Sequence, residues 1–152
     1  MASAHFDSTR RLADHTWRMT AALTVAFPCV GIGIALSNLG VREPAFAALG
    51  LGVALALAVF MLVTWGGRRV TERVAALPRL GPRALKGILA ALTVSVGAYF
   101  AAGAFATEAF ASTLSVAAQA AMNVVLIPMI TLTSTIGGAR DALALEAQSG
   151  QA

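Results

Sequence analysis

Four long stretches without a charged residue constrain this chain more than any other feature of its sequence. They run over residues 19–41, 44–67, 87–107 and 109–139. A transmembrane helix needs about 20 mostly apolar residues, and each stretch reaches that length. A transmembrane β-strand would instead alternate apolar and polar residues over about ten positions, whereas these stretches are apolar on all sides. We therefore predict an all-α integral membrane protein with four transmembrane helices.

Composition supports the same class. Of the 152 residues, 58% are hydrophobic and 12% are charged, with a mean hydropathy of +0.78. A soluble globular domain typically carries about 25% charged residues. The segments outside the four stretches are too short for a separate soluble domain. We expect residues 1–152 to form a single four-helix membrane domain, built as two helical hairpins joined by a basic loop over 68–86.

The basic residues predict the orientation of these helices. The chain has eleven Lys and Arg residues, and all except Arg42 lie in the N-terminal segment, the 68–86 loop or the C-terminal tail. Because basic residues are retained on the cytoplasmic side of short loops, the N- and C-termini and the loop are predicted to be cytoplasmic. This places the protein in the cell's inner (plasma) membrane. Trp17 and Trp65 fall at the same predicted inner interface, where indole side chains are favoured.

The first stretch has a second interpretation, as a cleavable signal. It follows a basic leader and ends with the small-residue pattern Ala-Leu-Ser at 35–37. A mature three-helix protein would then begin near Asn38. We favour a retained helix, because the apolar run reaches full spanning length and its Pro28 fits an ordinary packed helix.

Small residues recur four positions apart, which allows helix backbones to approach closely in a membrane. The sets are Gly33 and Ser37; Gly50, Ala54 and Ala58; Gly87, Ala91 and Ser95; and Gly97 and Ala101. Packing within the four-helix bundle accounts for them most simply. A face for self-association is the alternative.

The fourth stretch is charge-free but carries many polar side chains. On a helix, residues three and four apart share a face, and this places Ser112, Ser115, Gln119 and Asn123 in one stripe, with Ser134 returning near it. Neutral amides and hydroxyls avoid lipid by finding partners inside protein. We interpret the stripe as a helix-packing element. The alternative is that it lines a narrow pathway for water or substrate.

Two prolines lie inside the predicted spans. Pro28 is in the first and Pro128 in the fourth, and each removes a backbone N–H donor from its helix. Thr131 and its neighbouring hydroxyls follow Pro128 closely enough to bond the freed carbonyls. We predict helix kinks at both prolines.

Groups that carry chemistry are missing from the four stretches. None contains Asp, Glu, His, Lys or Arg; Glu108 lies in the turn before the fourth stretch, and His5 and His15 precede the first. Pumps and ion-coupled transporters need titratable or charged groups inside the membrane. Cys29 is the single cysteine, so the chain has no dithiol pair. We expect no catalytic activity, no cofactor and no metal site.

The 68–86 loop is the most distinctive segment outside the membrane. Its basic residues are Arg68, Arg69, Arg73, Arg79, Arg83 and Lys86, against the single acid Glu72. Val70, Val74 and Leu77 share one side of a helix that ends before Pro78, so this part is expected to lie along the inner leaflet. Anionic lipid is the first expected partner, and an acidic cytoplasmic protein the second. Without aromatic residues in the loop, nucleic acid is not expected as a partner.

These features favour a function without catalysis. We expect a small subunit of a multi-protein inner-membrane complex, for example a secretion, transport or respiratory assembly. In that role the helices supply packing surfaces to other membrane subunits or to further copies of the chain, and the basic loop docks a partner. The alternative is a small homo-oligomeric channel or transporter whose pathway is lined by the polar stripe of the fourth helix.

Overall fold

The structure is a computed structural model that describes residues 2–105 and 107–150. Its helices are α1 (Ala2–Asn38), α2 (Arg42–Ala76), α3 (Pro82–Phe105), α4 (Glu108–Ala120), the π-helical turn η1 (Ala121–Leu126) and α5 (Ile127–Ser149). α4, η1 and α5 follow one another without a break and form one long helix. Over the described residues the chain therefore has four helices long and apolar enough to cross a membrane, as predicted. It is a multi-pass membrane protein.

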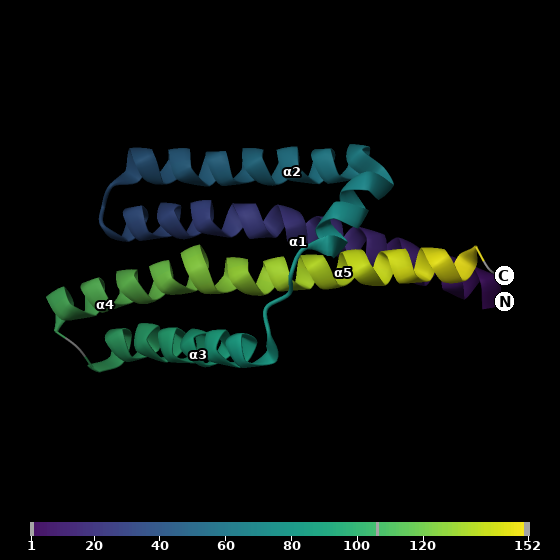
Figure 1. Ribbon diagram of the computed structural model, residues 1–152. Coiled ribbons are helices and arrows are strands. Elements are labelled where there is room, and N and C mark those ends of the chain that lie inside the picture. The colour runs from purple at the N-terminus through teal and green to yellow at the C-terminus, as the bar shows by residue number, and fades with distance from the viewer. Residues whose placement is uncertain (1, 106, 151–152) are drawn as a thin grey trace.

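The helices pack around α1 and the long helix (Figure 1). α1 contacts α2 along one side and contacts α4, η1 and α5 along another. Within the described chain, α3 contacts only the long helix, on the side away from α2. The first turns of α1 and the last turns of α5 lie at the same end of the bundle. The part of α2 after its bend crosses α1 and α5 short of that end, near Trp17 and Arg140.

Two helices extend further than the sequence predicted. α1 begins at Ala2 instead of near residue 19, because no glycine or proline interrupts residues 2–27. α5 likewise continues past residue 139 to Ser149. The two extensions are joined by the contact between Arg10 and Glu146, so both terminal segments continue the bundle as helices.

A short turn joins α1 to α2, and its geometry follows from one glycine. Gly40 has φ +78°, in the left-handed region that favours glycine. The Gly40 N–H donates to the Ser37 carbonyl at 3.0 Å, and the Val41 N–H donates to the Leu36 carbonyl at 3.0 Å. This pair of bonds is a Schellman motif, which satisfies the last carbonyls of a helix and reverses the chain.

α2 bends sharply at a second glycine. Gly67 has φ 51° and ψ −140°, outside the helical region, and it coincides with the predicted end of the second span. The segment after it, 68–76, is helical and stops before Pro78, as the spacing of Val70 and Val74 predicted. Val70 and Val74 are partly buried against the cluster that contains Trp17, so the bundle covers part of this apolar side. The position of the segment along the inner leaflet stays a prediction.

The two prolines have different local consequences. Pro128 follows η1 directly, at the start of α5. A proline ring clashes with the carbonyl four residues earlier, and the wider π-turn, with the Ile127 N–H bonded to the Met122 carbonyl, changes the backbone at that position. Pro28 lies inside α1, which continues through it as one helix, so a kink there stays a prediction.

Candidate functional site

One line of contacts runs the length of α1 and joins it to the long helix; we call it the α1 seam. Its α1 residues are seven apart: Arg10, Trp17, Thr24, Gly31 and Asn38. Their respective partners on the long helix are Glu146, Gly138, Thr131, Asn123 and Gln119. A seven-residue contact period is typical of left-handed packing of helices that wind around each other. The seam brings together residues of the predicted polar stripe and residues that sequence reasoning did not pair with them.

Two polar contacts, at Thr24 and at Asn38, lie on either side of Gly31 in the α1 seam. The Asn38 Nδ2 donates to the Gln119 Oε1 at 2.6 Å. The Thr24 Oγ1 donates to the Thr131 Oγ1 at 2.9 Å, and the Thr131 hydroxyl lies 3.0 Å from the Ile127 and Pro128 carbonyls, to which it can donate. In apolar surroundings such bonds set the rotation of one helix against the other.

At the middle of the seam the two backbones touch. Gly31 is buried, and a Cβ atom added there would lie 2.6 Å from the Cβ of Asn123 and 3.2 Å from its carbonyl carbon. Asn123 belongs to the π-turn and is half-buried. Only glycine leaves room for η1 to approach α1 this closely.

The remaining members of the predicted stripe lie elsewhere. Ser112 and Ser115 line a cavity of about 310 Å³ between α3 and α4, together with Tyr99 and Phe100. Ser134 is exposed on α5, beyond the π-turn. A π-turn rotates the positions after it relative to a straight helix, by about 100° per residue inserted. The return of Ser134 to the stripe stays a prediction.

Trp17 forms an apolar part of the α1 seam. It is 0% exposed, in a cluster with Val63, Ala139 and Ala142, and a Cβ added at Gly138 would lie 2.8 Å from the Trp17 Cβ. Its side chain is therefore covered by protein, and its position at the membrane interface stays a prediction. Trp65 is 83% exposed, as a lipid-facing interfacial residue would be.

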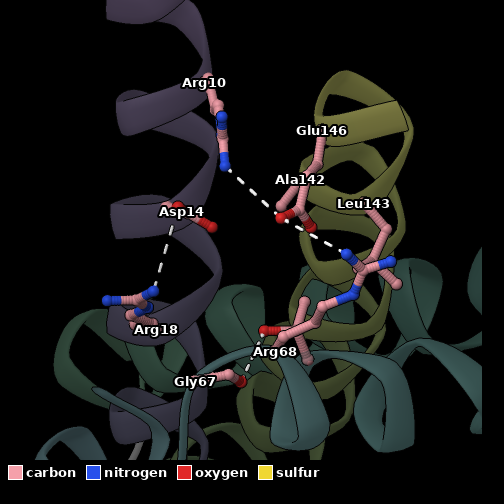
Figure 2. Close-up of a pocket in the computed structure, with 9 residues that line it drawn as sticks. Arg10, Asp14, Arg18, Gly67, Arg68, Ala142, Leu143 and Glu146 are labelled. Atoms are coloured by element: carbon pink, nitrogen blue, oxygen red, sulfur yellow. Dashed lines mark hydrogen bonds and ion pairs between the residues drawn. The ribbon is translucent and has the colours of Figure 1, made fainter. Parts of the chain in front are cut away.

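A charged cavity of about 180 Å³ lies beside this cluster, and Ala142 belongs to both; we call it the arginine cavity (Figure 2). Its lining comes from α1 (Arg10, Asp14, Arg18), from the bend of α2 (Gly67, Arg68, Thr71) and from α5 (Ala142, Leu143, Glu146). No local sequence pattern signals it, because its walls come from three separate parts of the chain.

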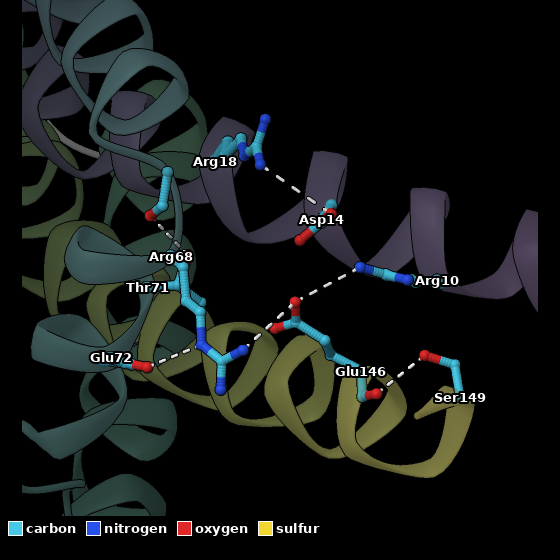
Figure 3. Close-up of polar contacts among 9 residues, drawn as sticks. Arg10, Asp14, Arg18, Arg68, Thr71, Glu72, Glu146 and Ser149 are labelled. Carbon is cyan, nitrogen blue, oxygen red and sulfur yellow. Dashed lines mark hydrogen bonds and ion pairs between the residues drawn. The ribbon is translucent and has the colours of Figure 1, made fainter. Parts of the chain in front are cut away.

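Ion pairs cross the arginine cavity, and most of them are long (Figure 3). Glu146 lies 3.5 Å from Arg10 and 3.7 Å from Arg68, and Asp14 lies 3.9 Å from Arg18. The shortest contact, 2.8 Å between the Arg68 Nε and Glu72, lies outside the cavity lining. Glu146 therefore links α5 to both α1 and α2.

All six predicted basic loop residues are exposed: Arg68, Arg69, Arg73, Arg79, Arg83 and Lys86. Two of them also contact other parts of the chain. Arg68 is paired with Glu72, and the Arg79 guanidinium lies against α5, where a Cβ added at Gly137 would be 3.0 Å from one of its nitrogens. Exposure leaves all six accessible to lipid or a partner.

Arg140 is a residue whose role sequence reasoning missed. Its guanidinium donates to the Ala75 carbonyl at 2.7 Å and to the Leu77 carbonyl at 2.9 Å. These carbonyls belong to the end of the helical 68–76 segment and the residue after it. Arg140 therefore fastens the end of α2 to α5, across a sequence separation that no local pattern reveals.

The small-residue sets also divide into buried and outward-facing members. A Cβ added at Gly33 would lie 2.8 Å from the Leu49 side chain, so Gly33 serves contact between α1 and α2. At Gly50, Gly87 and Gly97 an added Cβ meets nothing within 4 Å among the described residues. Contacts within this chain therefore account for the set of Gly33 and Ser37, and not for the sets that contain Gly50, Gly87 and Gly97.

No protein-family model, curated protein or solved structure matched this chain.

Proposed function

We propose that this protein is a non-catalytic small subunit of a multi-protein inner-membrane complex. The observation that carries the proposal is the set of small-residue faces on α2 and α3 that the chain's own helices leave open. Close approach of small residues is the main route by which helices associate in lipid. Gly50, Ala54 and Ala58 are exposed on α2, and Gly97 and Ala101 are exposed on α3.

The position of α3 adds to this argument. Among its residues Ala102 is the one that is buried, and within the described chain its helix contacts are confined to the long helix. α3 therefore offers most of its surface to lipid or to another subunit. The exposed basic residues Arg69, Arg73 and Arg83 offer a second surface at the inner end, suited to anionic lipid or an acidic partner.

The proposal includes an orientation, with both termini and the α2–α3 connection in the cytoplasm. In a variant whose Cys29 is replaced by serine, a new cysteine at Gly81 is expected to react only with reagent supplied from the cytoplasm, and one at Val41 only from outside. Both positions are exposed. Labelling of Gly81 from outside the cell would overturn the orientation.

Co-purification in mild detergent tests the subunit proposal. Gly97→Leu on α3 and Gly50→Leu on α2 fill open surfaces, so each is expected to remove captured membrane subunits while the chain itself stays folded. Leu89→Phe is the matched control, because it enlarges an exposed α3 side chain outside the small-residue sets. Loss of captured subunits with Leu89→Phe as well, or retention with both glycine variants, would contradict the proposal.

A homo-oligomeric channel is the second candidate. The observation that favours it is the cavity between α3 and α4, lined by the hydroxyl-bearing Tyr99, Ser112 and Ser115. Against it, the Asn38–Gln119 bond and the Gly31–Asn123 contact fill the α1 seam with protein. An oligomer of this chain alone that passes a neutral solute in vesicles, and loses that flux in Ser115→Leu, would favour the channel.

A further inference from the structure

The arginine cavity lies where the bend of α2 meets the first half of α1 and the last turns of α5, toward the end of the bundle that holds both termini. Arg10, Asp14 and Arg18 are spaced four apart, so they share one face of α1. Arg68 enters from the α2 bend and Glu146 from α5 (Figure 2). Its volume of about 180 Å³ is well above the roughly 10–15 Å³ that one water molecule requires.

Arginines outnumber carboxylates in the lining of this cavity. Three guanidinium groups and two carboxylates line it, and the Nε of Arg68 also donates to Glu72, outside the lining, at 2.8 Å. The ion pairs among them span 3.5–3.9 Å, whereas charge-assisted N–H···O bonds are normally about 2.7–2.9 Å. Two carboxylates therefore do not satisfy the N–H groups of three arginines.

Arg18 carries the clearest deficit. Its side chain is 20% exposed, and its Nε is buried with no hydrogen-bond partner among the described residues. Among the described residues, the Nε1 of neighbouring Trp17 is a second buried N–H donor without a hydrogen-bond partner. Buried donors without a partner are costly, so this end of the bundle lacks an acceptor.

We propose that the arginine cavity binds a phosphate group, with Arg18 and Arg68 as its principal ligands. Phosphate offers several oxygens in the geometry that the planar guanidinium fork matches, and it can accept from more than one arginine at once. A lipid headgroup and free phosphate share this chemistry. Because the cavity lies at the end of membrane-spanning helices, an anionic phospholipid is the expected source. This site stands independently of the proposed subunit role.

Binding to the purified full-length chain in neutral detergent tests the proposal. The probes are short-chain phosphatidylglycerol, inorganic phosphate and short-chain diacylglycerol, which has no phosphate. Retention is measured by native mass spectrometry and affinity by the shift in unfolding temperature. Phosphatidylglycerol is expected to bind, and diacylglycerol is expected not to bind. Binding of inorganic phosphate without binding of phosphatidylglycerol would support the site and identify free phosphate as its ligand. Equal binding of diacylglycerol, or no binding of either phosphate probe, would overturn it.

Substitutions separate a binding site from a structural ion-pair cluster. Arg18→Gln is expected to weaken binding about ten- to hundredfold, since it removes charge-assisted bonds. Arg42→Gln, at an exposed position outside both the cavity and the basic 68–86 segment, is the control and should change nothing. Glu146→Gln is expected to strengthen binding, because it removes a carboxylate that competes for Arg10 and Arg68. Weaker binding in Glu146→Gln with an intact unfolding transition, or equal losses in Arg18→Gln and Arg42→Gln, would refute the proposal.

Discussion

Gly31→Ala tests the closest contact of the α1 seam. The added Cβ would lie 2.6 Å from the Asn123 Cβ, 3.1 Å from the Val124 Cγ2 and 3.2 Å from the Asn123 carbonyl carbon. Carbon atoms in favourable contact are about 3.5–4.0 Å apart, so α1 and η1 must separate by up to about 1 Å. A gap of that size forfeits about a quarter to a half of each contact energy along the seam.

The magnitude follows from two opposing terms. Overpacking typically costs about 1–3 kcal/mol, and replacing glycine by alanine in a helix gains about 1 kcal/mol. Gly97→Ala on α3 is the matched control, because its added Cβ meets nothing within 4 Å among the described residues. The gain in helix propensity from glycine to alanine is the same in both variants. Their free energies of unfolding should therefore differ only by the cost of overpacking, about 1–3 kcal/mol, with Gly31→Ala the less stable.

Cys29 provides a native probe for this comparison. It is the only cysteine in the sequence, and it lies against Gly52 of α2, where an added Cβ would be 2.9 Å from the Cys29 Cβ. Its rate of reaction with a maleimide, measured during titration from mild to denaturing detergent, follows the separation of α1 and α2. If Gly31→Ala and Gly97→Ala unfolded at the same detergent fraction, the close backbone contact between α1 and η1 would be refuted.

Three further predictions concern the polar contacts. A double-mutant cycle of Asn38→Leu and Gln119→Leu should give a coupling free energy of about 0.6 kcal/mol, and zero coupling in detergent unfolding would exclude the bond as a stabilising contact. Asn123→Leu should weaken the bundle slightly and Asn123→Asp far more, because a carboxylate at that depth must be desolvated or protonated; equal unfolding midpoints would contradict this. Arg140→Gln should speed amide hydrogen exchange at the end of the 68–76 segment, with unchanged exchange as the contrary result.

Sequence reasoning succeeded where the controlling physics is local. The four spans follow from the absence of charges over lengths that match a bilayer, and all four are helices in the structure. The end of the helical segment after Gly67 follows from the spacing of Val70 and Val74 and from Pro78. Each of these depends on residues within a few turns of one another.

The candidate sites depended on which helices meet and in which rotation. Asn38 and Gln119 are 81 residues apart in the sequence, and Arg10 and Glu146 are 136 apart. Hydropathy and helical period describe how a segment distributes its own side chains, so they carry no information on such partners. The sequence alone therefore determined that Gln119 needs a partner inside protein, but only the packing of α1 on the long helix selected Asn38.

Trp17 and Ser134 show what tertiary structure adds to a local pattern. Trp17 is completely buried, because Gly138 lets the backbones of α1 and α5 approach each other. The π-turn before Pro128 changes the rotation of the residues that follow it, Ser134 among them, relative to a straight helix. A hydrophobic pattern determines that a segment lies in the membrane or in the protein interior. Whether an individual side chain faces lipid or another helix depends on which helix surfaces are in contact.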